Sequence, residues 1–285
     1  MRPGKAELKT QGLLYLVATP IGNLEDITFR AVRVLSEVDL IAAEDTRHSR
    51  KLLSHYQIQT PLLSYHEHNE RKRTPQLIDK LNRGINIALI SDAGTPCVAD
   101  PGYRLVSACQ AAGIRVVPVP GPSALIAALC VAGLPTDSFL FQGYLPTRQK
   151  ARLDLLRKLQ AAQRTLVFYE APHRLIKSLN DIAAVYGDDC PMAIARELTK
   201  RHEEIYRGTA CSAQDYFQSA TVKGELVLLL TPDAADPPTD MHEALRQMLS
   251  ESGLPRRQVV KIIASEYAIS SREVYKESLK LREES

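Results

Sequence analysis

The sequence predicts an α/β protein with two α/β lobes, followed by a small helical unit. Short apolar runs alternate with amphipathic segments from about residue 13 to residue 132, and the alternation resumes near residue 136. Such alternation is typical of a mostly parallel sheet with helices on both faces. Beyond residue 240, only helical periodicity remains. We therefore expect lobes at residues 1–133 and 134–232, and a linker with a helix-turn-helix-like tail at residues 233–285.

In the first lobe, short apolar runs that end at turn-forming residues predict strands, and longer amphipathic runs predict helices. Gly113 signals a helix end, and Gly121-Pro122-Ser123 signals a helix start. The expected strands are residues 13–18, 38–43, 61–65, 85–90 and 115–119, and the expected helices are residues 28–37, 46–55, 74–82, 103–112 and 123–132.

The second lobe repeats this alternation and ends at a linker rich in Pro, Ala and Asp, residues 231–238. Residues 192–197 and 202–206 are close enough in the chain to form a pair of strands. The expected strands are residues 139–144, 165–169, 192–197, 202–206 and 224–230, and the expected helices are residues 148–160 and 174–186.

The composition indicates a globular protein with sizeable cores, because 45% of the 285 residues are hydrophobic. The net charge of +3, from 36 Lys and Arg against 33 Asp and Glu, does not by itself identify a partner. None of the five Cys lies in a CxxC pair and their number is odd, which favours reduced thiols in the cytoplasm. We expect no secretory signal and no membrane span, because residues 1–10 are charged and no apolar run reaches membrane length.

The loop at residues 91–102, SDAGTPCVADPG, is the most informative stretch of the chain. It follows the buried strand expected at residues 85–90 and holds two Gly, two Pro and two Asp. Gly permits close backbone approach and Asp can accept hydrogen bonds from a ligand. Because open α/β sheets bind ligands at the carboxyl ends of their strands, this loop predicts a binding site. An ordinary strand-to-helix turn is the alternative.

Two further strand-to-helix turns, at residues 19–23 and 120–124, carry small or polar residues. Ser123 stands at a helix start, where a hydroxyl or a free N–H can meet an anionic ligand group, although it can equally serve as a simple N-cap. The chain contains neither G-x-G-x-x-G nor G-x-x-x-x-G-K-[ST], which argues against a dinucleotide fold and a P-loop NTPase.

The motifs LYLVATPIGNLEDIT at residues 14–28, SDAGTP at 91–96, PGPSA at 120–124, YEAPHR at 169–174 and RELTK at 196–200 occur in this order. Together they resemble the tetrapyrrole methylase superfamily, the class III S-adenosylmethionine (AdoMet) methyltransferases. Within it, residues 12 to 285 are similar to the bacterial enzymes that methylate the 2′-hydroxyl of a 16S rRNA cytidine near the decoding centre. Ala18 and Pro20 stand where tetrapyrrole enzymes often have Gly, which disfavours a tetrapyrrole substrate.

This resemblance implies that AdoMet binds in a cleft between the two lobes, and that the protein is a homodimer. It assigns cofactor contacts to the first, second and third turns of the first lobe and to two positions of the second lobe. These residues are Pro20 and Ile21; Asp92, Gly94 and Thr95; Ser123 and Ala124; and Tyr169 and Ala195.

Methyl transfer to a ribose hydroxyl requires the hydroxyl proton to leave to a base or to water. Carboxylates at the expected strand ends are the candidate bases, namely Glu44, Asp45, Glu170 and Glu197. Asp45 can also be a helix N-cap with Glu44 as a dipole-compensating neighbour, and the sequence favours that interpretation.

Clusters of Arg and Lys predict contacts with the phosphates of an RNA, although each can also be a solvated helix face. They are Arg47, Arg50 and Lys51; Arg148, Lys150 and Arg152; and, in the tail, Arg256, Arg257 and Lys276. The tail also carries a capping box from Ser270 to Glu273, and it can alternatively serve as a packing or dimerisation element.

The sequence predicts no metal site, because His66-Glu67-His68 lacks a third ligand at a characteristic spacing. The function expected is therefore AdoMet-dependent methylation of 16S rRNA in the 30S subunit by a cytoplasmic enzyme. A tetrapyrrole C-methyltransferase and a non-catalytic rRNA-binding assembly factor are the two alternatives.

Overall fold

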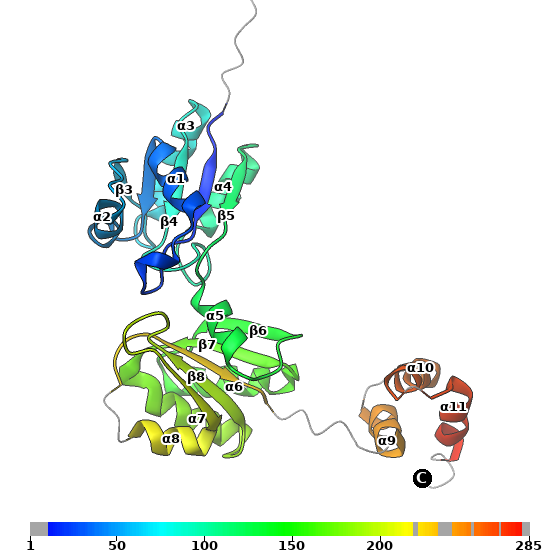
Figure 1. The fold of residues 1–285 in the computed structure, drawn as a ribbon. Coiled ribbons are helices and arrows are strands. Elements are labelled where there is room, and N and C mark those ends of the chain that lie inside the picture. Colours follow the sequence, from blue (N-terminus) through cyan, green and yellow to red (C-terminus); the bar gives the residue numbers. More distant parts are fainter. Residues whose placement is uncertain (1–10, 219–221, 233–240, 252–253, 268, 281–285) are drawn as a thin grey trace, which may run out of the picture. The chain divides into compact units, whose positions relative to one another are not determined.

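The computed structural model describes residues 11–218, 222–232, 241–251, 254–267 and 269–280. The chain divides into two compact units, with the boundary in the sequence between Pro232 and Asp233. The first unit contains two five-stranded sheets, and the second contains helices (Figure 1).

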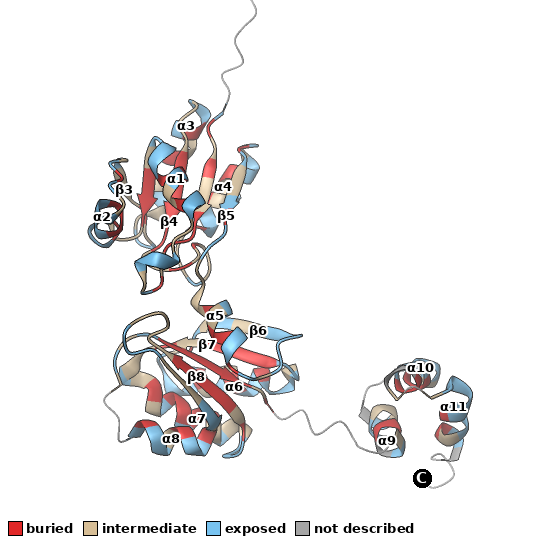
Figure 2. Cartoon of the chain, viewed as in Figure 1, coloured by how far each residue is buried: buried red, intermediate tan, exposed pale blue. Residues whose placement is uncertain are grey.

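The first sheet has the strand order β3-β2-β4-β1-β5, and every pair is parallel. Its central strands are buried (Figure 2) because helices cover both faces. Helices α1 and α2 pack on one face, and α3 and α4 on the other. The elements are β1 (Leu14–Val17), α1 (Phe29–Glu37), β2 (Leu40–Ala43), α2 (Thr46–His55), β3 (Leu62–Ser64), α3 (Glu70–Asn82), β4 (Ile87–Ile90), α4 (Tyr103–Ala111) and β5 (Val116–Val119). The predicted parallel sheet is confirmed.

Helix α3 begins a full turn earlier than expected. The Thr74-Pro75 sequence predicts a helix start, because Pro is favoured at the first helical position. Instead Asn69 is the N-cap and Pro75 lies inside the helix. The Asn69 side chain accepts a hydrogen bond of 3.0 Å from the His66 N–H, which fixes the turn before the helix.

The second sheet is mixed, with the order β6-β7-β10-β8-β9. β6 pairs with β7 in parallel, and the other neighbours are antiparallel. Helices α6, α7 and α8 cover one face. The elements are β6 (Phe139–Tyr144), α6 (Gln149–Leu159), β7 (Thr165–Glu170), α7 (Leu175–Tyr186), β8 (Pro191–Arg196), β9 (Glu204–Thr209), α8 (Ala210–Gln218) and β10 (Leu226–Leu230). The predicted pairing of β8 with β9 is confirmed. Helix α8, which buries Ala210, Ala213 and Phe217, was not predicted from the sequence.

Helix α5 (Ala124–Val131) packs against the other face of this second sheet. Its buried Leu125 and Leu129 belong to the same cluster as Val167 and Val227 of the sheet. The packing thus associates α5 with the second sheet, although the expected lobe boundary at residue 133 assigns it to the first. Since Ser123 starts α5, the third turn of the first sheet leads directly to the second sheet.

The last unit contains three helices among its described residues: α9 (Met241–Glu251), α10 (Arg256–Glu266) and α11 (Ser271–Lys280). Leu245, Val259 and Val274 form its fully buried centre. The predicted capping box is present: the Glu273 N–H donates to Ser270 Oγ at 3.3 Å, and that hydroxyl donates to Glu273 Oε2 at 2.8 Å.

Candidate functional site

Three loops at the carboxyl ends of β1, β4 and β5 are joined by hydrogen bonds. Thr19 and Gly94 exchange two backbone hydrogen bonds of 2.9 Å as an isolated antiparallel bridge. Thr95 Oγ1 donates to the Pro122 carbonyl oxygen at 3.1 Å. Gly94 has a φ of +79°, and a Cβ there would lie 3.3 Å from Ile21 Cγ2. The short motifs that the sequence analysis singled out therefore form one continuous wall.

This wall faces residues of the second sheet across a cleft of about 960 Å³, which includes the part open to solvent. The lining residues are Ile21, Glu44, Asp92, Ala93, Gly94, Thr95, Val98, Asp100, Ser123, Ala124, Tyr144, Tyr169, Ala195, Glu197, Leu198, Lys200, Glu225, Leu226 and Val227.

Eight of the nine residues predicted to contact the cofactor line this cleft: Ile21, Asp92, Gly94, Thr95, Ser123, Ala124, Tyr169 and Ala195. Pro20 instead lines a neighbouring groove with Gly22, His48 and Lys51. Ser123 is the N-cap of α5, and its Oγ lies 3.5 Å from the Ile126 nitrogen. This agrees with the N-cap role, one of the two roles that the sequence predicted for Ser123.

Strained backbone surrounds the cleft on both sides. Cys97 and Ala99 have φ values of +71° and +64°, and Glu197 and Thr199 have φ values of +51° and +64°. Non-glycine residues rarely adopt this left-handed region, and when they do they cluster at ligand sites. Close packing holds the second segment, because a Cβ at Gly224 would lie 1.8 Å from Glu197 Oε1.

The cleft is acidic, with one Lys against five carboxylates among its lining residues. Burial, together with the charges of the nearby Glu44 and Asp92 carboxylates, raises the pKa of Asp100 to about 6. Burial, followed by the Asp92 charge, also raises the pKa of Glu44. Lys200 lies 2.8 Å from Glu197 Oε1, and this hydrogen bond lowers the pKa of Glu197.

The four candidate bases have different surroundings, and Glu197 lines the cleft. Glu44 lines the cleft. Asp45 is the N-cap of α2, accepting from the Arg47 N–H at 2.8 Å, and its hydrogen bonds to Arg47 hold the pKa of its carboxyl well below the usual range. The N-cap interpretation of Asp45 is thus confirmed.

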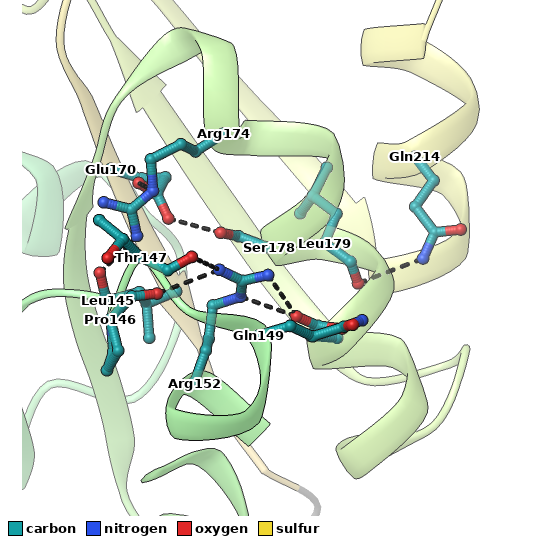
Figure 3. A network of polar contacts seen from close by, with 11 residues as sticks. Leu145, Pro146, Thr147, Gln149, Arg152, Glu170, Arg174, Ser178, Leu179 and Gln214 are labelled. Carbon is teal, nitrogen blue, oxygen red and sulfur yellow. Dashed lines mark hydrogen bonds and ion pairs between the residues drawn. The ribbon is translucent and has the colours of Figure 1, made fainter. Parts of the chain in front are cut away.

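Glu170 is not in the cleft, which corrects its prediction as a base. Its carboxylate is fully buried and accepts a hydrogen bond from Ser178 Oγ (Figure 3). The carboxylate also accepts from the Ala171 N–H and lies 3.2 Å from Arg174 Nε. These bonds stabilise the start of α7, because Ser178 and Arg174 lie at that end of the helix. The sequence pattern alone does not distinguish a carboxylate that ends a strand in an open cleft from a carboxylate that ends a strand and is buried beneath a helix.

Arg152 also differs from its prediction as an RNA contact. Its side chain is 3% exposed and pairs with Asp181 Oδ2 at 2.5 Å. It also donates to the carbonyl oxygens of Pro146 and Thr147 (Figure 3). A guanidinium buried in this way braces α6 against α7 and does not reach a phosphate.

The other basic residues lie mostly at the surface. Arg256 is an exception, because it donates to the Ser278 carbonyl oxygen at 2.9 Å within the tail. Arg47 is 87% exposed and pairs with Asp45. Arg50, Lys51, Arg148, Lys150, Arg257 and Lys276 are all exposed.

Four polar or aromatic cleft residues were not predicted as site residues from the sequence: Asp100, Tyr144, Lys200 and Glu225. Each lies in or beside a motif or strand that was recognised, so the signal was their proximity to a strand end. Within the described ranges, no group of three or more His, Cys, Asp or Glu could hold a metal ion. None of the described helices is long and apolar enough to cross a membrane.

A cleft at the carboxyl ends of parallel strands, closed by a second mixed sheet, defines the class of protein. The model of the tetrapyrrole (corrin/porphyrin) methylases matches residues 13–214, and the chain belongs to this family. Among its relatives are proteins named ribosomal RNA small subunit methyltransferase I. The protein of that name from Synechocystis sp. is 51% identical over 276 residues, covering 95% of this chain and 98% of the relative. The one from Escherichia coli O157:H7 is 45% identical over 282 residues, covering 98% and 99%.

A solved structure supports the same fold. The uroporphyrin-III C-methyltransferase of Thermus thermophilus, complexed with S-adenyl homocysteine, aligns with a TM-score of 0.55. The alignment covers 76% of this chain and 97% of that chain at 18% identity. At this identity, the likeness concerns the fold alone.

Proposed function

We propose that this chain transfers the methyl group of AdoMet to the ribose 2′-hydroxyl of a cytidine in 16S rRNA, near the decoding centre. The observation that carries the proposal is the acidic cleft between three joined loops and the second sheet. Its relatives along nearly the whole chain are named for methylation of small-subunit rRNA.

The cleft residues fit AdoMet in both charge and shape. AdoMet carries a positive sulfonium and an ammonium group, which the carboxylates of Asp92, Asp100 and Glu225 complement. Tyr144 and Tyr169 contribute aromatic faces whose ring centroids lie 5.6 Å apart, a suitable wall for an adenine. When bound, AdoMet supplies an electrophilic methyl group that a hydroxyl oxygen can attack.

The hydroxyl proton needs an acceptor on this chain, and two half-buried carboxylates of the cleft are suited to this role. Glu44 and Asp100 both have raised pKa values, and the pKa of Asp100 is about 6. A base is most effective when its pKa lies close to the working pH. As the new C–O bond formed, the bond between the methyl group and the sulfonium sulfur would break and S-adenosylhomocysteine would leave, while the carboxylate would take the hydroxyl proton.

The exposed Arg and Lys residues of α2, α6 and the tail are candidates for phosphate contacts. Lys51, Lys150 and Arg257 represent the three groups. Each phosphate contact releases counterions, so affinity for the 30S subunit should fall steeply with salt. A cytoplasmic location follows from this substrate.

A second copy of the chain completes the proposed assembly. Apolar side chains on α5 and on the edge strand β6 are exposed, including Ile126, Val131 and Phe139. An exposed apolar surface on an edge strand is suited to pairing with another copy. Sedimentation at micromolar concentration should show a dimer, and a monomer alone would contradict this part of the proposal.

The decisive experiment compares methylation of 30S subunits and naked 16S rRNA with labelled AdoMet, followed by mapping of the label. We expect one labelled cytidine ribose and a strong preference for 30S subunits. Label on a base would contradict the reaction. Methylation of a tetrapyrrole instead of rRNA would favour a C-methyltransferase. Failure to bind AdoMet at millimolar concentration would favour an RNA-binding assembly factor.

A further inference from the structure

A second pocket adjoins the cofactor cleft, and Asp100 lines both. Part of its wall comes from the first turns of two helices, with Glu70 from α3 and Tyr103 and Arg104 from α4. Asp100 therefore stands between the cleft and the neighbouring pocket. A group held in this second pocket would lie beside whatever occupies the cleft.

The wall between the two cavities has unusual backbone geometry. Cys97 and Ala99 adopt left-handed φ values of +71° and +64°. Gly102 has a φ of +142°, and a Cβ at this position would lie 2.5 Å from Cys97 Sγ. Strain of this kind persists only where the surrounding structure enforces it, and it is concentrated at functional sites. The loop thus has a defined path that places Asp100 and Tyr103 on the same pocket.

The polar groups of the pocket suit a nucleobase better than a phosphate. Arg104 Nε lies 3.1 Å from Glu70 Oε1, and their side chains are 46% and 18% exposed. Glu67 and Asp100 add two further carboxylates, so the pocket is acidic overall and would repel a phosphate. Among the described residues, no other hydrogen bond engages the Glu70 or Arg104 side chain.

The Glu70–Arg104 pair matches the hydrogen-bonding edge of cytosine. A carboxylate accepts from the exocyclic N4 amino group of cytosine. A guanidinium donates, so it can reach the N3 and O2 acceptors on the same edge. Uracil presents an O4 acceptor in place of the amino group, and a carboxylate would repel it. The pair therefore distinguishes the two pyrimidines by charge and hydrogen-bond direction.

Tyr103 provides a stacking surface for such a base. It is 79% exposed at the first position of α4, although it is a large aromatic residue. Proteins that act on unpaired nucleotides hold the base by stacking it on exposed aromatic rings. An exposed ring beside an ion pair and a carboxylate provides both stacking and edge recognition.

We propose that this pocket binds the cytosine base of the nucleotide to be methylated, with Tyr103 stacking on the ring and Glu70 and Arg104 reading its edge. The inference rests on the proposed function, since it identifies the acceptor site of that reaction. Asp100 would then lie on the side of the base from which the ribose enters the cleft.

The test measures methyl transfer to 30S subunits that carry either cytidine or uridine at the mapped position. Wild type should prefer cytidine, and Glu70→Gln should lower this preference about tenfold, because its amide can donate to uracil O4. Tyr103→Ala should lower kcat/KM for 30S subunits about tenfold, whereas Tyr103→Phe retains the ring and most of the activity. AdoMet affinity, measured by calorimetry, should remain at the wild-type value in all three variants.

Glu37→Gln is the matched control, because Glu37 forms a similar ion pair with Arg33 at 3.1 Å on the exposed face of α1. It should leave both the rate and the base preference unchanged. An unchanged preference in Glu70→Gln, or wild-type kcat/KM in Tyr103→Ala, would overturn the base pocket while the methyltransferase activity stands. A wild-type enzyme that binds AdoMet but labels no rRNA would overturn the proposed function itself.

Discussion

Thr95 Oγ1 donates a hydrogen bond of 3.1 Å to the carbonyl oxygen of Pro122, across 27 residues of chain. The bond joins the loop after β4 to the turn that starts α5. The backbone bridge between Thr19 and Gly94 joins the same loop to the turn after β1. Since α5 packs on the second sheet, these contacts connect the three loops that line the cleft to both sheets.

Thr95→Val should weaken AdoMet binding while leaving the chain folded. Valine has nearly the same shape but cannot donate to Pro122, so the second and third loops lose their side-chain link. The expected loss is about 0.5–1.5 kcal/mol of binding free energy, the usual net value of such a bond. Calorimetric titration with AdoMet measures it directly.

Thr60→Val is the matched control for this prediction. Thr60 Oγ1 donates to the Leu35 carbonyl oxygen at 2.6 Å, a bond of the same kind that lies outside the cleft. It should lower the free energy of unfolding by a similar amount without changing AdoMet affinity. Equal AdoMet affinities in wild type and Thr95→Val would show that the loops are held together without this bond.

Asp92→Ala should lower AdoMet affinity by about 1–3 kcal/mol, the cost of leaving a buried polar partner unsatisfied. Asp92 lines the cleft, and its Oδ1 also accepts a 2.9 Å hydrogen bond from the Asp45 N–H. Asp39→Ala is the control for losing a hydrogen bond to the backbone without losing a cofactor contact, because Asp39 Oδ2 accepts a comparable 2.8 Å bond from the Asn86 N–H. If both variants bind AdoMet like wild type, Asp92 has only a structural role.

The pH dependence should report on Asp100, whose pKa is raised to about 6, mainly by burial. A carboxyl with a raised pKa favours the folded state when protonated, and this contribution disappears as the pH rises through the folded pKa. Asp100→Asn should therefore stabilise the protein by about 1–2 kcal/mol at pH 8, with no gain near pH 4. Denaturant unfolding at the two pH values measures the difference.

The same substitution should slow methyl transfer if Asp100 accepts the hydroxyl proton. Single-turnover rates of wild type should rise with pH through about 6 and then level off, because the base must be ionised. Asp100→Asn should lose this step. Asp189→Asn, at an exposed position, is the control that should retain it. A wild-type rate that is flat from pH 5 to 8 would exclude Asp100 as the base.

Much of the fold and of the cofactor wall could be predicted because their signals are local. Apolar runs predict strands, and the ligand-facing turns follow directly at their ends, as for Thr95 and Ser123. The roles of Glu170 and Arg152 could not be predicted in this way. Both lie on elements whose boundaries match the expected ones to within one residue, but packing of α6 and α7 buries their charges. Asp100 was not predicted as a site residue for a different reason. It lies in a loop with strained backbone, and the path of that loop, which the sequence does not reveal, decides where its side chain lies.

Arg152→Ala and Lys150→Ala should have opposite consequences, although the residues are two positions apart. Removing Arg152 leaves the Asp181 carboxylate buried without its ion pair, which should cost about 3–5 kcal/mol of stability. Lys150 is exposed, so its removal should change stability by less than about 0.5 kcal/mol. It should instead reduce the slope of log affinity for 30S against log salt by about 0.7–0.9. An unchanged slope would show that α6 does not contact phosphate.

The tail offers a separate test of RNA recognition, because residues from Asp233 onward form their own compact unit with their own buried centre. Deleting residues 238–285 should leave AdoMet affinity at the wild-type value, since none of the tail residues that the structure describes lines the cleft. Affinity for 30S subunits should fall and its salt slope should become shallower, because phosphate contacts are lost. The double variant Arg257→Glu and Lys276→Glu tests the charges in the full-length chain, since both side chains are exposed. It should reproduce the effect of the deletion on 30S binding. Normal 30S methylation by the truncated chain would assign the tail to packing or dimerisation instead.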